Sequence, residues 1–117
     1  MRAELLRVVS EAPEPPGHLS PCGAELWRRI VALYVLELHH LEILRLSLEA
    51  LDRCEEARRV LAEEGAYTRN RAGVPIPHPA VGVERDAGLR AARLLRELDL
   101  DDEVPADVRP PRGRRSR

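Results

Sequence analysis

The longest regular pattern of hydrophobic positions runs through the middle of the chain. From about Leu38 to Glu64 there is no proline or glycine. Apolar residues recur there at a spacing of about 3.5 residues: Leu41, Leu44, Leu48, Leu51, Cys54, Ala57 and Leu61. This pattern predicts one long helix with a hydrophobic seam. More apolar surface lies beside the seam, at Ile43, Leu46 and Ala50. We therefore expect the seam to contact helices of a second copy of the chain as well as helices of the same chain. The residues expected to make this contact are Leu41, Leu44, Leu48 and Leu51.

A shorter amphipathic segment precedes this helix. Ser20 followed by Pro21 is typical of a helix start, with serine as the N-cap and proline in the first turn. The apolar residues that follow fall on one broad face at helical spacing: Leu26, Trp27, Ile30, Val31, Leu33 and Tyr34. We therefore expect the folded domain to begin near Leu19, after a proline-rich stretch at 12–17 that favours an extended linker.

Gly65 and Pro79 mark the end of the long helix and the start of a third one. The apolar side of this third helix is narrow in its first half: Ala80, Ala87, Ala91, Leu94 and Leu98. Its polar side carries four arginines: Arg85, Arg90, Arg93 and Arg96. The helix is expected to end near Leu98, because the acidic, proline-containing stretch that follows cannot continue it.

The segment between these two helices predicts a β-hairpin at 66–77. Tyr67 and Thr68 favour extended backbone on one arm, and Val74 and Ile76 do so on the other. The turn falls at Arg71-Ala72-Gly73, where the glycine permits a positive φ. Prolines at 75, 77 and 79 restrict the hairpin to edge pairing.

These patterns predict a mainly α fold, a helical hairpin or bundle with a short β-hairpin between the second and third long helices, assembling into an oligomer. Aromatic residues make up 3% of the 117 residues, so leucine, isoleucine, valine and alanine must fill the core, as in helical bundles. Three regions are expected: an arm and proline-rich linker at 1–18, a helical core at 19–98, and an acidic then arginine-rich flexible tail at 99–117.

No apolar stretch approaches the roughly 20 residues needed to cross a bilayer, and residues 1–10 are too short and too charged for a signal peptide. We expect a cytosolic protein without membrane contact. Cys22 and Cys54 lack Cys-x-x-Cys spacing, which favours plain thiols in a reducing cytosol.

The net charge of -1 conceals an uneven distribution. Residues 97–108 contain six acids and no arginine, whereas residues 109–117 contain five arginines and no acid. All 19 lysine or arginine positions are arginine. The clustering of charge is therefore more informative than its total.

Signatures of catalysis are missing from the sequence. It contains no glycine-rich phosphate loop, no Gly-x-Ser-x-Gly and no His-Glu-x-x-His. Neighbours His39 and His40 diverge by about 100° on a helix, which is unsuited to one shared metal. His39 and Glu42 are better explained as a solvated polar pair than as metal ligands, and His18 and His78, beside glycine or proline, suit structural or incidental roles. We therefore expect that the protein is not an enzyme and that it binds no cofactor.

Two sites support a binding hypothesis. Arg69 and Arg71 alternate with Thr68 and Asn70, so on a strand both guanidinium groups would leave the same side and could clamp phosphate. A solvated loop or an inter-subunit salt bridge explains them equally well.

The second site is a polycationic tail that could contact nucleic acid without reading its sequence. Its arginines are Arg109, Arg112, Arg114, Arg115 and Arg117. In the alternative, the tail folds back on the acidic stretch 97–108, which would itself regulate DNA binding.

The order and spacing of these features resemble the small terminase subunit of tailed double-stranded DNA phages. The resemblance runs from about residue 19 to 109 and is carried by Leu19-Ser20-Pro21, Trp27, Tyr34, Glu64-Gly65, the hairpin, His78-Pro79-Ala80 and Leu94-Leu95-Arg96-Glu97-Leu98. Family members often have a glycine after the third helix, then a proline followed by an arginine. Here Asp99 replaces that glycine, while Pro105 and Arg109 loosely keep the rest.

The resemblance implies a non-enzymatic subunit of a genome-packaging motor in the host cytoplasm. Such proteins form homo-oligomeric rings, bind double-stranded viral DNA and present it to the large terminase subunit, which holds the ATPase and nuclease. Two alternatives stay open: a small helical DNA-binding regulator, such as a transcription factor or antitoxin, and a structural head or neck protein of the virion. The junction at Leu36-Glu37-Leu38 lacks the glycine often found in a helix-turn-helix.

Overall fold

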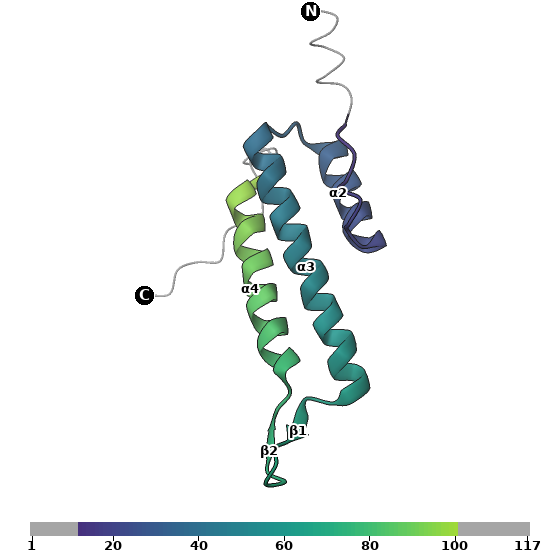
Figure 1. Ribbon diagram of the computed structural model, residues 1–117. Coiled ribbons are helices and arrows are strands. Elements are labelled where there is room, and N and C mark those ends of the chain that lie inside the picture. The colour runs from purple at the N-terminus through teal and green to yellow at the C-terminus, as the bar shows by residue number, and fades with distance from the viewer. Residues whose placement is uncertain (1–11, 101–117) are drawn as a thin grey trace, which may run out of the picture.

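The computed structural model describes residues 12–100 of the chain, which form three helices and one two-stranded sheet. The elements in chain order are α2 (Pro21–Leu33), α3 (Leu38–Glu64), β1 (Tyr67–Arg69), β2 (Pro75–Pro77) and α4 (Pro79–Leu98). The long helix α3 lies between α2 and α4, with α4 antiparallel to it (Figure 1). The mainly α fold with a hairpin between the second and third long helices is confirmed.

The start of α2 is bonded directly to α3. Ser20 is the N-cap, and its Oγ accepts a hydrogen bond from the N–H of Gly23 at 3.0 Å. The carboxylate of Asp52 on α3 accepts from the Ser20 N–H at 2.7 Å and from the Ser20 hydroxyl at 2.5 Å. A Cβ at Gly23 would lie 2.9 Å from Asp52 Oδ1, so the absence of a side chain there lets α2 approach α3.

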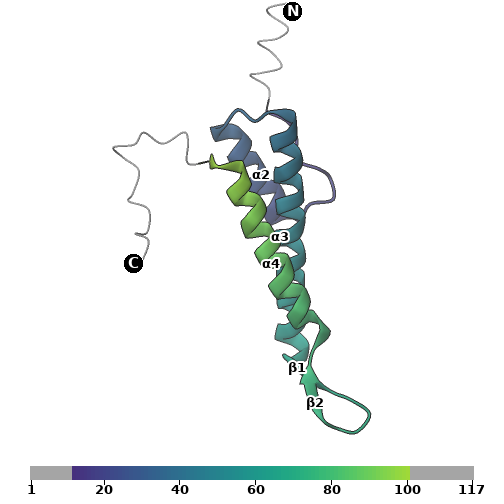
Figure 2. The ribbon, with the colours of Figure 1, turned by 90° about the vertical axis from the view of Figure 1, so that its left-hand side faces the viewer.

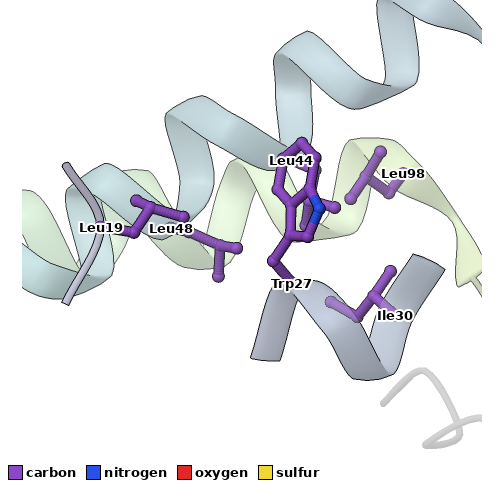
Figure 3. Packing of buried hydrophobic residues seen from close by; sticks show 6 residues of the cluster. All are labelled: Leu19, Trp27, Ile30, Leu44, Leu48 and Leu98. Atoms are coloured by element: carbon purple, nitrogen blue, oxygen red, sulfur yellow. The ribbon is translucent and has the colours of Figure 1, made fainter. Parts of the chain in front are cut away.

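All three helices contribute to one hydrophobic core (Figure 3). Its buried members are Leu19, Trp27, Ile30, Leu44, Leu48 and Leu98. Leu44 and Leu48 have no exposed surface. The indole N–H of Trp27 donates to the carbonyl oxygen of Pro13 at 2.9 Å, which attaches the proline-rich segment to α2.

Further along, α3 and α4 pack through small side chains. The buried residues of this contact are Ala50, Cys54, Ala57, Ala87 and Ala91. Small side chains allow two helix axes to approach closely, and a Cβ at Gly88 would lie 3.4 Å from Cys54 Sγ. The narrow apolar side expected of the third helix therefore faces α3. Cys54 is a buried free thiol, whereas Cys22 is exposed.

Beyond this contact the chain forms the predicted β-hairpin. β1 pairs antiparallel with β2, with Thr68 opposite Ile76. Gly73 has a φ of 78° and donates its N–H to the Asn70 carbonyl oxygen at 2.9 Å, as expected for a turn that needs a positive φ. Every residue from 65 to 77 is exposed. The hairpin extends past the end of the helix pair that lies away from α2 (Figure 2).

Asp99 follows the last residue of α4, at a position where many helices have a glycine. Asp99 adopts the left-handed conformation, with φ 50° and ψ 51°, and its N–H donates to the Arg96 carbonyl oxygen at 3.1 Å. A left-handed residue after a helix is usually glycine, but a short polar side chain tolerates this conformation.

Ala91→Leu tests the small-residue contact. Ala91 is 3% exposed against α3, so three extra carbon atoms have no room, and we expect a loss of about 1–3 kcal/mol in the free energy of unfolding. Ala92→Leu makes the same change at an exposed neighbour and should change stability by less than about 0.5 kcal/mol. Urea unfolding followed by circular dichroism measures both. Equal stability of the two variants would contradict the close packing of α4 on α3.

Candidate nucleic-acid interface

The exposed hairpin presents two arginines and no acidic residue. Arg69 ends β1, and its Nη1 donates to the Gly73 carbonyl oxygen at 2.6 Å. Arg71 lies in the turn. The expected same-side arrangement of the two arginines does not follow from strand alternation, because β1 ends at Arg69. The loop is instead shaped by Asn70, whose Oδ1 accepts from the N–H groups of Ala72 and Val74 at 2.9 and 3.0 Å.

His78 holds the base of the hairpin. Its Nδ1 accepts from the N–H of Ala80 at 3.0 Å and so caps α4, while its Nε2 lies 2.9 Å from Glu64 Oε1 at the end of α3. The His78 backbone N–H also donates to the Ala66 carbonyl oxygen at 2.8 Å. These contacts require the tautomer with the proton on Nε2. The structural role expected for His78 is confirmed.

Several arginines of the helical body form ion pairs. Arg28 and Arg29 pair with Glu25. Arg58 bridges two helices, since it contacts Glu55 on α3 and Glu84 on α4, each at 3.0 Å. These contacts agree with the mixed-sign helix faces of the sequence, where charges neutralise one another.

Glu49 forms the most connected of these pairs. It accepts from His18 at 2.6 Å and from Arg45 at 2.9 Å, and Arg45 also reaches Glu42 at 2.6 Å. Burial raises the pKa of the Glu49 carboxyl, but the hydrogen bonds from His18 and Arg45 together lower that pKa below its ordinary value. This contribution to stability is present above the ordinary pKa and is lost as the pH falls through the lowered one.

Other arginines have no carboxylate within 4.0 Å in the part of the chain from 12 to 100. They are Arg53, Arg59, Arg69, Arg71, Arg90, Arg93 and Arg96. Two of them are in the hairpin and three are on α4. The sequence shows where arginines occur, but only the structure shows which of them form ion pairs.

The two adjacent histidines do not diverge as expected. The ring centroids of His39 and His40 are 4.0 Å apart. Both bend back toward Glu37 at the N-cap of α3: His40 Nδ1 accepts the Glu37 N–H at 3.4 Å, and His39 Nδ1 lies 3.5 Å from Glu37 Oε2. Ligand atoms of these three residues lie within 4.8 Å of one another, and the contact of His40 with Glu37 is part of a capping box at the start of α3. Glu42 contacts Arg45.

The four leucines predicted to assemble the oligomer divide into two pairs. Leu44 and Leu48 are fully buried within the chain and leave no surface for a second copy, whereas Leu41 and Leu51 are half-buried beside the core. The buried pair is covered by residues that approach from α2 and α4.

Large apolar side chains are exposed instead at the connection between α2 and α3. Leu33, Val35 and Leu38 are 76%, 78% and 79% exposed, and we refer to them as the α2–α3 corner. The sequence pattern placed Leu33 on the buried face of its helix. The structure differs because α2 ends at this residue, so no further turn brings it against α3.

The five tail arginines Arg109, Arg112, Arg114, Arg115 and Arg117 lie outside the described residues, as does the acidic stretch beyond residue 100. Their assignment to DNA binding stays a prediction.

Comparison with known proteins identifies the family. A family model described as "Phage terminase, small subunit" matches residues 23–112, which include nearly all of α2, the whole of α3 and α4, and the hairpin. No curated protein and no solved structure matches the chain. None of the helices within residues 12–100 is both long and apolar enough to cross a membrane.

Substitutions of His78 test its role at the base of the hairpin. His78→Ala removes the cap of α4 and the contact with Glu64, so we expect stability to fall by about 1–2 kcal/mol and hairpin amides to exchange faster. His78→Asn retains a capping oxygen and should recover most of the stability but not the Glu64 contact. Hydrogen exchange read by mass spectrometry over residues 66–77 distinguishes the variants. Unchanged exchange in His78→Ala would show that the histidine does not hold the hairpin.

Proposed function

Because the chain belongs to the phage terminase small-subunit family, we propose that it is the DNA-binding subunit of a viral genome-packaging motor. In this proposal it acts in the host cytoplasm, assembles into a homo-oligomeric ring, binds double-stranded viral DNA and presents it to the large terminase subunit. ATP hydrolysis and DNA cleavage belong to the large subunit, and the present chain catalyses neither. The family match carries the proposal, because it extends over nearly the whole helical body rather than one motif.

Exposed apolar surface supports the assembly. The three side chains of the α2–α3 corner are each more than three-quarters exposed to water, which is unfavourable unless a partner covers them. Half-buried Leu41 follows Leu38 by one helical turn on α3, and Leu51 lies further along it. We therefore assign the contact between copies to the corner together with Leu41 and Leu51. Leu44 and Leu48 support it from inside by fixing α2 on α3.

Charge supports the DNA contact. A guanidinium group has five N–H donors, so the bond from Arg69 to Gly73 leaves donors free for phosphate, and Arg71 is exposed beside it. The tail adds five arginines per chain. A ring would multiply both sets into a dense positive surface that attracts DNA.

Assembly is tested first by light scattering after size exclusion. We expect the intact chain to form a closed oligomer of more than two subunits. A triple variant with Leu33, Val35 and Leu38 changed to glutamate should dissociate, because burying three charges in an apolar contact is costly. Leu89→Glu, at an exposed leucine of α4, serves as the control and should stay assembled. A monodisperse monomer would rule out the ring, and a stable dimer would favour the regulator.

DNA binding is tested by titrations at several salt concentrations. Deleting residues 109–117 should weaken binding and flatten its salt dependence by roughly one unit of slope for each lost phosphate contact. Arg69→Ala with Arg71→Ala tests the hairpin separately, after a check of assembly. Arg28→Ala with Arg29→Ala removes the same charge from ion-paired arginines and is the matched control. If the intact and tailless proteins have equal DNA affinity and equal salt slope, the tail does not contact DNA. Assembly without any DNA affinity would favour a structural virion protein.

A further inference from the structure

The outward side of α4 carries a row of arginines that neither the hairpin nor the tail includes. Arg90, Arg93 and Arg96 follow one another at intervals of three, so they fall within one arc of about 120° on the helix. All three are exposed. The opposite side of α4 is buried at Ala87, Ala91 and Leu98. Figure 2 shows α4 lying in front of α3, so this outward side faces away from the rest of the helical body.

No carboxylate of residues 12–100 forms an ion pair with the row, and two of the nearest ones contact other arginines. Arg85 Nε contacts Asp86 Oδ1 at 3.1 Å, and Glu84 accepts from Arg58 at 3.0 Å. Glu97 follows Arg93 by four positions, but no ion pair joins them within 4.0 Å. Within residues 12–100, the row thus differs from Arg28, Arg29, Arg45 and Arg58, whose guanidinium groups each contact a carboxylate.

We propose that Arg90, Arg93 and Arg96 form a binding site for the phosphodiester backbone of double-stranded DNA. The inference rests on the proposed function and adds a second contact surface to it. The row spans about 9 Å along the axis at 1.5 Å per residue, and each strand of a duplex offers one phosphate per about 3.4 Å of its axis. Each guanidinium therefore has a phosphate within reach, which it can bind through two parallel hydrogen bonds.

Such a row holds the duplex without reading its sequence, since phosphate contacts carry no base information. The alternative ligand for this row of arginines is an acidic segment of a partner protein. Leu89 is 54% exposed on the same side of α4, but a single exposed leucine is normal on a protein surface. Because no carboxylate within residues 12–100 pairs with the row, its guanidinium groups favour phosphate.

The experiment compares two double variants of the full-length chain. Arg90→Gln with Arg93→Gln removes two charges from the row, and Arg28→Gln with Arg29→Gln removes two charges from ion-paired arginines of α2. Arg96 is left in place because it lies in the last turn of α4, where a cation also favours the helix dipole. Circular dichroism melting and light scattering confirm that both variants fold and assemble. Fluorescence anisotropy with a labelled duplex of random sequence then gives the affinity over a series of salt concentrations.

We expect the α4 variant to lose about two units of salt slope and at least tenfold in affinity at low salt, while the α2 variant keeps the slope of the unchanged chain. Unchanged affinity and slope in the α4 variant, with normal DNA binding by the unchanged chain, would overturn the inference and leave the proposed function intact. If the unchanged chain binds no duplex at any salt concentration, both the inference and the proposed function are wrong. An α4 variant that binds DNA normally but no longer binds the large subunit would also overturn the inference and assign the row to a protein.

Discussion

The packing of α4 on α3 through alanine, glycine and cysteine side chains is the contact on which the rest of the structure depends. Because these side chains are small, the two helices lie close together and antiparallel over much of their length. The connection between them must then reverse the chain over a short distance, which the hairpin and the His78 cap accomplish. The same contact brings Leu98 back to Trp27 and completes the core.

This arrangement separates two kinds of surface. At one end of α3 lies the exposed apolar α2–α3 corner, and at the other end the exposed hairpin with its arginines. The arginine row lies in the C-terminal half of α4, which runs back toward the start of α3 and packs its Leu98 beside Leu44 and Trp27, so the row is nearer to the corner end than to the hairpin. We infer that contacts between copies form at the corner, and that contacts with DNA form along the outward side of α4 and at the hairpin.

The elements themselves could be predicted from the sequence because their signals are local. Ser20-Pro21 starts a helix, Gly73 allows a positive φ, and Pro79 opens the last helix, whatever the rest of the chain does. Contacts between distant residues have no such signal. Neither the bond from Trp27 to Pro13 nor the attachment of Ser20 to Asp52 could be inferred from spacing.

The candidate site shows the same division between local and distant information. A period of about 3.5 residues identified an apolar seam, yet it could not tell that the chain itself covers Leu44 and Leu48 while Leu33 and Leu38 stay exposed. Likewise, the positions of the arginines were evident, but their partners were not. Asp86 lies four residues before Arg90, a spacing that favours an ion pair, but it contacts Arg85 instead.

The DNA-binding role of the hairpin and α4 is tested most directly by an arginine footprint of the assembled protein with and without duplex DNA. A dicarbonyl reagent modifies accessible guanidinium groups, and mass spectrometry reports the extent of modification at each position. We expect DNA to protect Arg69, Arg71, Arg90 and Arg93, while ion-paired Arg28 reacts equally in both samples. Equal modification of the hairpin and α4 arginines with and without DNA would contradict the assignment of this surface to DNA.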